Sequence, residues 1–171
     1  GGTMVVWRHA ESLPIAREAL ALARRIGAGE AEVRALTVIA SDLAYLGEPD
    51  EGRATFRESL RLAEQIEDLI GLERIYVNFT DALTMLGRLR ESALLGAEGL
   101  EAMRRYGVDN TMLVENQVET LVALGEWEEA EQLSEAALRR AIATSPHWLL
   151  VRRAEVEIGR GHFEAARTRL A

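Results

Sequence analysis

The sequence repeats itself at a spacing of about 40 residues, and this internal repeat restricts the possible fold more than any other feature. Shifting the chain by 40 residues places Gly47 on Gly87. Further shifts of 38 and 36 residues carry the same position to Gly125 and Gly161. A steady pattern with a shrinking step indicates one structural unit whose loops vary in length. We therefore expect an array in which each unit packs mainly against its neighbours.

Each unit has the pattern of two helices. Apolar residues at helical spacing, such as Leu36, Ile39 and Leu43, are followed by the repeated glycine, which favours a helix end. Ala, Leu, Glu and Arg make up 93 of the 171 residues, a composition typical of helices. A further helix is expected at 9–26, where Pro14 requires either a start near Ser12 or a kink. The predicted helix pairs are 30–46 with 49–67, 71–86 with 89–106, 110–124 with 127–143, and 146–159 with 162–171.

Small residues recur at fixed places in the second helix of each unit. Two helices approach to about 8 Å only where no bulky side chain separates them. We therefore expect these positions to be buried where helices cross, and we place Trp127 and Phe163 in the core beside them. The small positions are Ser12, Ala19, Gly52, Ser59, Ser92, Gly99, Ala130, Ala137 and Ala166.

The residue types that are missing exclude several kinds of chemistry. All 20 cationic side chains are arginines, and cysteine is absent, so lysine Schiff bases, thiolate nucleophiles and cysteine zinc sites are impossible. The three histidines lie on separate segments. A net charge of −8 disfavours direct nucleic-acid binding. We expect a cytoplasmic, non-enzymatic chain with no cofactor, metal site or membrane segment.

The repeat resembles the tetratricopeptide repeat (TPR), most closely in the segments 124–130 (LGEWEEA) and 161–166 (GHFEAA). Gly52 and Ser92 depart from the alanine that this family has at the equivalent position. The resemblance implies an all-α, right-handed α-solenoid of about four helical hairpins that binds a protein or peptide. It implies one domain over 1–171, with a half repeat at 8–27 and repeats at 30–67, 71–107, 110–143 and 146–171.

A narrower resemblance is carried by the segments 11–24 and 76–88, which look like the repeat region of large bacterial transcriptional regulators. In that family an ATPase module precedes the repeats and a LuxR-type helix-turn-helix follows them. The resemblance implies a sensor or coupling region whose partners include flanking domains of the same polypeptide. We also expect a piece of a larger protein, because the predicted array opens on an unpaired helix and closes in mid-helix. The alternative is a structural spacer or self-association module, with homo-oligomers as the outcome.

The candidate binding residues lie on the first helices, which line the concave side of such a solenoid. Asn78 and Asn116 share one repeat position, and an asparagine amide offers a donor and an acceptor to a peptide backbone. The alternative is that asparagine is merely tolerated on a solvated face. The candidates are Arg34, Tyr45, Arg74, Asn78, Asp81, Asn116, Glu119, Trp148 and Arg152.

The three arginines among these candidates have two interpretations. Each guanidinium is suited to a bidentate contact with a carboxylate or phosphate of a partner. Acidic residues are plentiful on the same helices, however, so we favour ion pairs within the chain, to Asp81, Glu119 or Glu155.

Overall fold

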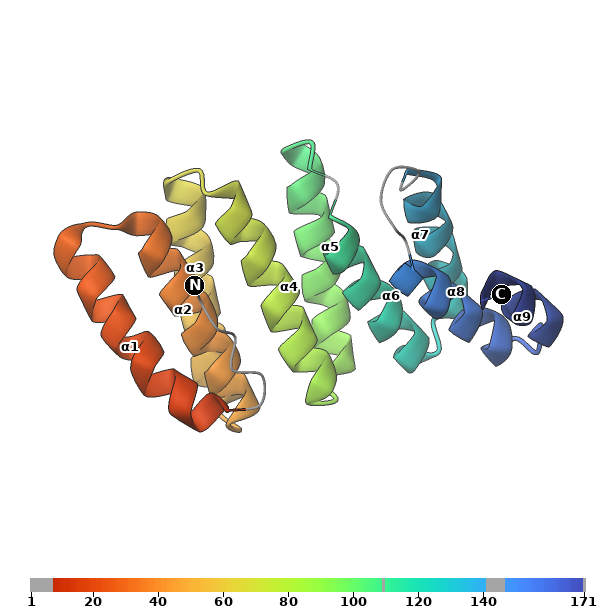
Figure 1. Cartoon of the computed structure of the whole chain (residues 1–171), viewed down its shortest axis with the longest axis horizontal. Coiled ribbons are helices and arrows are strands. Elements are labelled where there is room, and N and C mark those ends of the chain that lie inside the picture. The colour runs from red at the N-terminus through yellow and green to blue at the C-terminus, as the bar shows by residue number, and fades with distance from the viewer. Residues whose placement is uncertain (1–7, 109, 141–146, 171) are drawn as a thin grey trace. The chain divides into compact units, whose positions relative to one another are not determined.

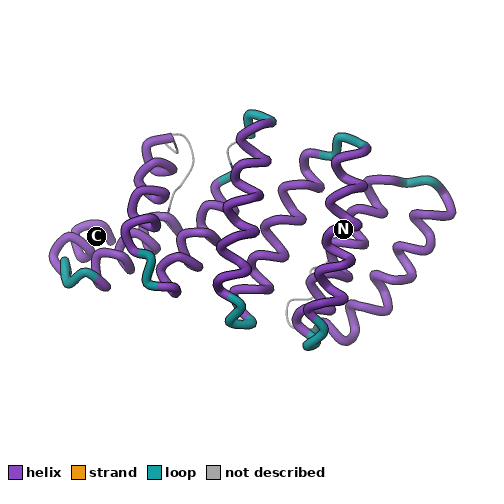
Figure 2. The backbone as a smooth tube through the Cα atoms, turned by 180° about the vertical axis from the view of Figure 1, so that it is seen from behind, coloured by secondary structure: helices purple, strands orange, loops and turns teal. Residues whose placement is uncertain are grey.

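The computed structural model describes residues 8–108, 110–140 and 147–170, and every regular element in these ranges is an α-helix (Figure 1). Short loops join successive helices wherever the connection is described (Figure 2). The chain divides into two compact units, Gly1–Leu86 and Gly87–Ala171, which we describe separately. The all-α prediction is therefore confirmed. The right-handed superhelix and the division into a half repeat and four repeats stay predictions.

The first unit is built around its second helix. The helix α2 contacts α1, α3 and α4, and α3 also contacts α4. Because three helices pack around α2, it is apolar over most of its circumference, and Leu36, Ala40 and Leu43 are all buried. Phe56 of α3 stacks on Phe79 of α4 at 4.7 Å between ring centroids, joining these two helices. The helices are α1 (His9–Ile26), α2 (Gly29–Tyr45), α3 (Pro49–Gln65) and α4 (Leu69–Met85).

In the second unit, α6 packs against α5, α7 and α8, and α8 also contacts α7 and α9. Its apolar core includes Val118 and Leu121 of α6, Ala130 of α7 and Val156 of α8. The helices are α5 (Leu89–Arg105), α6 (Thr111–Leu124), α7 (Trp127–Arg140), α8 (His147–Gly159) and α9 (Phe163–Leu170).

The predicted helices agree with the observed ones to within two residues at each described end. Predicted residues 141–143, 146 and 171 lie outside the described residues. Gly47, Gly87, Gly125 and Gly161 all have positive φ angles, as expected where a helix ends in the left-handed conformation. After α3 the residue in this conformation is Glu67, which has a φ of 56°. The left-handed conformation is unfavourable for a residue with a side chain, so it costs free energy here. Pro14 lies inside α1, so the alternative start near Ser12 is wrong.

The small residues of α3 lie where predicted, at its contact with α2. A Cβ atom on Gly52 would be 2.7 Å from the carbonyl oxygen of Ala40, so α3 could not approach α2 this closely with any larger residue. About two helical turns further along α3, Ser59 donates a hydrogen bond of 3.0 Å to the carbonyl oxygen of Val33 in α2. Ser92, Gly99, Ala130 and Ala166 are buried as well, whereas Ala137 is only half-buried.

The prediction for Ala19 is wrong, because this residue is exposed, and Ser12 is only half-buried. The equivalent face of α3 is covered by α2, the helix before it. No described helix precedes α1, so the same face of α1 remains open. Instead Ala16, on the neighbouring stripe of α1, packs against Ile39 and Leu43 of α2.

The placement of Phe163 in the core is also wrong, since 65% of its surface is exposed at the start of α9. Trp127 is 36% exposed and lies against Gly159. Charged residues occupy part of the space between α7, α8 and α9 instead. The Arg153 side chain is only 7% exposed and pairs with Glu131 and, at 3.2 Å, with Glu135. These ion pairs explain why α8 carries charges on its inward face.

Candidate functional site

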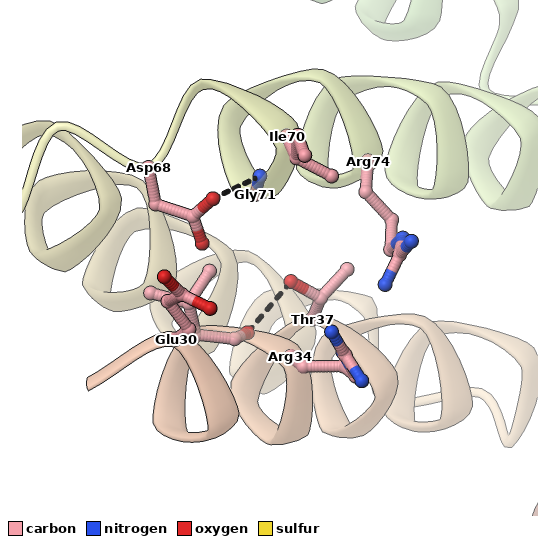
Figure 3. A pocket seen from close by; sticks show the side chains of 8 residues that line it. Glu30, Arg34, Thr37, Asp68, Ile70, Gly71 and Arg74 are labelled. Atoms are coloured by element: carbon pink, nitrogen blue, oxygen red, sulfur yellow. Dashed lines mark hydrogen bonds between the residues drawn. The ribbon is translucent and has the colours of Figure 1, made fainter. Parts of the chain in front are cut away.

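A pocket of about 90 Å³ lies between α2 and α4 in the first unit. Arg34 of α2 and Arg74 of α4 extend their guanidinium groups toward it from opposite walls (Figure 3). Thr37 lines the wall between them, and its hydroxyl donates a 2.8 Å hydrogen bond to the carbonyl oxygen of Val33. The volume is enough for several water molecules or for one small anionic group.

The charges of Arg34 and Arg74 are not compensated by any residue in the described part of the chain. Neither guanidinium forms a hydrogen bond or ion pair with any of the described residues. The expected ion pairs are therefore wrong for these two arginines. The predicted partner on α4, Asp81, instead accepts a hydrogen bond of 2.8 Å from the hydroxyl of Tyr45. Two exposed cations that face one pocket, with no partner among the residues that the structure describes, form a site that attracts an anion.

Carboxylates line the other end of the same pocket. Asp68 is the N-cap residue of α4, and its Oδ1 accepts a 2.8 Å hydrogen bond from the Gly71 backbone N–H. Glu30 stands in the first turn of α2. In Figure 3 these two carboxylates lie at one end of the pocket and the two guanidinium groups lie at the other. The pocket is thus divided into an acidic and a basic end.

Glu30 and Asp68 were not among the residues that the sequence singled out. The available signal was an acidic residue at a helix start followed by an arginine, which occurs in both α2 and α4. This signal was not distinctive, because acidic residues at helix starts are favoured by the helix dipole in any protein. Only the pairing of α2 with α4 brings the two acidic residues to one pocket.

At their C-terminal ends, α2 and α4 are joined by a polar network. The Tyr45 ring stacks on the His9 ring at 4.2 Å, and His9 Nδ1 lies 2.8 Å from the buried carboxylate of Asp42. Burial and, secondarily, its hydrogen bond to Asp81 raise the pKa of the Tyr45 hydroxyl, so it remains a donor. Tyr45 and Asp81 therefore form a fixed wall of this face, whereas Asn78 lies half-buried on α4 between that wall and Arg74.

On the equivalent face of the second unit, the predicted arginine is compensated by carboxylates of the same unit. Arg152 of α8 forms ion pairs of 2.9 Å with both Glu119 of α6 and Glu155 of α8, as the sequence predicted. Burial raises the pKa of the neighbouring Glu115 carboxyl, which favours its uncharged form. Trp148 is 54% exposed on α8. This face offers a large apolar ring but no uncompensated arginine among the described members of the predicted site.

The structure thus divides the predicted site residues between two faces. Arg34, Tyr45, Arg74, Asn78 and Asp81 share the α2/α4 face of the first unit. Asn116, on α6, is half-buried in the second unit, together with the paired Glu119 and Arg152 and the exposed Trp148. The two asparagines therefore lie in different units.

Neither a family model nor a curated protein matches this chain. Over the described ranges, no group of three or more histidine, aspartate or glutamate side chains is arranged to hold a metal ion. Likewise, none of the described helices combines the length and apolar character needed to cross a bilayer.

Proposed function

We propose that this chain binds a protein or peptide segment on the α2/α4 face, with an acidic group of the partner held between Arg34 and Arg74. The observation that carries the proposal is the pair of arginines, uncompensated by the described residues, that faces one pocket from two helices. Arginine is suited to this task because its planar guanidinium presents paired donors to a carboxylate.

The remaining features of this face support an extended segment as the ligand. Asn78 follows Arg74 by one helical turn, where its amide would be available to a peptide group. Beyond it, the hydrogen bond from Tyr45 to Asp81 holds α2 and α4 together before any ligand arrives. A face ordered in advance loses little conformational entropy on binding.

The test is a selection from a random peptide library on the immobilised protein. We expect the wild-type chain to enrich peptides that contain Asp or Glu, because these supply the carboxylate for the arginines. The double variant Arg34→Gln with Arg74→Gln should bind the enriched peptides about tenfold more weakly, which corresponds to about 1.4 kcal/mol. Circular dichroism would establish that this variant is folded.

Arg152→Gln is the matched control, because Arg152 is already paired with Glu119 and Glu155. It should leave the affinity for the same peptides unchanged. A library that yields no acidic preference, or peptides that bind equally to the double variant, would contradict the proposal.

A second candidate is self-association through the open face of α1. Ile15 and Ile26 are 66% and 65% exposed there, and Leu22 and Ala19 lie on the same helical stripe. Such a stripe favours helix pairing between copies of the chain. Sedimentation velocity at increasing concentration tests this: a dimer that Leu22→Glu with Ile26→Glu dissociates would support self-association, and a wild-type monomer throughout would exclude it.

The role in a bacterial transcriptional regulator, as its sensor or coupling region, stays a prediction from the sequence resemblance. Both candidate functions are compatible with that role.

A further inference from the structure

The pocket between α2 and α4 has like charges opposite each other across the two helices. Along α2, Glu30 precedes Arg34, and along α4, Asp68 precedes Arg74. The two carboxylates consequently share one end of the pocket and the two guanidinium groups share the other (Figure 3). Like charges placed next to each other are unfavourable, and a ligand with the complementary charges relieves the repulsion at both ends.

The two carboxylates at the acidic end of the pocket can still accept hydrogen bonds from a ligand. Asp68 accepts the hydrogen bond from the Gly71 N–H through Oδ1, but a carboxylate has several acceptor sites and carries its charge on both oxygens. Glu30 is exposed and forms no ion pair with the described residues. A cationic group of a ligand therefore has two acceptors here, just as an anionic group has two donors at the other end.

The separation of the two ends fits an extended peptide. A helix rises about 1.5 Å per residue, so Glu30 and Arg34 are about 6 Å apart along α2, and Asp68 and Arg74 are about 9 Å apart along α4. In an extended peptide, side chains two residues apart point to the same side and are about 6.6 Å apart. An acidic and a basic side chain in an acid–x–base arrangement would reach both ends together.

We propose that the pocket of Glu30, Arg34, Asp68 and Arg74 recognises a dipolar motif, in which an acidic residue of an extended partner segment is separated by one residue from a basic one. This inference rests on the proposed peptide-binding function and specifies its ligand. It distinguishes the pocket from a purely basic patch, which would favour the most acidic segment available. The basic residue supplies specificity, because a segment with two acidic residues places a carboxylate against Glu30 and Asp68.

Fluorescence anisotropy with three labelled heptapeptides tests the inference. Each peptide is N-acetylated and C-amidated, has Gly-Ser flanks, and carries Glu-Ala-Arg, Glu-Ala-Gln or Glu-Ala-Glu at its centre. We expect Glu-Ala-Arg to bind wild-type protein about fivefold more tightly than Glu-Ala-Gln, on the scale of partly exposed ion pairs. Glu-Ala-Glu should bind no more tightly than Glu-Ala-Gln.

The decisive variant is Glu30→Gln with Asp68→Asn, since asparagine retains the N-cap hydrogen bond to Gly71 while the charge is lost. It should bind Glu-Ala-Arg and Glu-Ala-Gln with equal affinity, and Glu-Ala-Gln at least as tightly as the wild-type protein does. The matched control is Glu18→Gln with Glu64→Gln, which removes two exposed charges from the same unit outside the pocket. It should keep the fivefold preference.

The outcomes separate the two proposals. If all three peptides bind wild-type protein equally, or if Glu-Ala-Glu binds most tightly, the dipolar motif is refuted while acidic peptides remain ligands. If none of the three binds, the proposed function fails and the motif fails with it. A preference that survives Glu30→Gln with Asp68→Asn would also overturn the inference, because the acidic end would then not be its source.

Discussion

Gly52→Ala is predicted to destabilise the protein even though alanine is the better helix former. In an unhindered helix the substitution would stabilise by about 1 kcal/mol. At Gly52 the added methyl group would lie 2.7 Å from the Ala40 carbonyl oxygen and 3.2 Å from the Ala44 nitrogen, both backbone atoms. Backbone cannot swing aside as a side chain does, so α3 must move away from α2. Overpacking costs about 1–3 kcal/mol, and a clash with backbone atoms belongs to the upper half of this range, so after the gain of about 1 kcal/mol the net loss is about 1–2 kcal/mol.

The assay is thermal unfolding followed by circular dichroism at 222 nm. For a chain of this length we expect the midpoint to fall by about 3–6 °C. Ala54→Gly is the matched control, because Ala54 is exposed in the same helix and two residues away. It measures the intrinsic glycine penalty, about 1 kcal/mol, without any helix contact. If Gly52→Ala raises the midpoint by as much as Ala54→Gly lowers it, the two helices do not meet at this glycine.

Three further predictions concern other parts of the two units. Glu67→Gly should stabilise the chain by about 1 kcal/mol in urea unfolding, because Glu67 has a φ of 56°; a loss of stability would show that its side chain matters more than its backbone. The hydrogen bond from Arg169 holds the pKa of Glu157 below its usual range, so this stabilisation is complete above about pH 4.3 and is lost as the pH falls through the lower folded-state pKa. Glu157→Gln should accordingly give a flatter stability profile below pH 4.3, and an unchanged profile would refute the assignment. Arg153→Ala should cost about 2 kcal/mol, since it removes the hydrogen bonds of a buried guanidinium, while Glu131 keeps Arg160 and Glu157 keeps Arg169 as partners; a cost below about 0.5 kcal/mol would contradict the buried ion-pair network.

The sequence was sufficient to predict the helices and where they pack closely. Periodic apolar residues and terminal glycines are local signals, and they depend little on the rest of the chain. The burial of Gly52 and Ser59 was also predictable, because a mid-helix glycine needs a packing contact to offset its cost. Ala19 shows the limit of this reasoning. Its small side chain could be buried only by a helix packed on that face, and none of the described helices lies there, so Ala19 is exposed.

The candidate site was predictable only in part. The repeat register placed Arg34 and Arg74 on one face, but not which arginines would find partners within the chain. Arg152 is neutralised because α6 brings Glu119 to within 2.9 Å of it. On α4 the comparable carboxylate, Asp81, is engaged by Tyr45 instead. Such choices depend on side-chain geometry between helices, which residue spacing alone does not determine.

The central claim is that Arg34 and Arg74 hold an anionic group, and arginine side-chain NMR tests it most directly. The Nε–Hε signals would be assigned by single Arg→Gln substitutions and followed while the acetylated, amidated Glu-Ala-Gln peptide is added. The account predicts that the signals of Arg34 and Arg74 shift together and saturate with one affinity, while that of Arg152 stays in place. A shift of the Arg152 signal with those of Arg34 and Arg74 unmoved would contradict it.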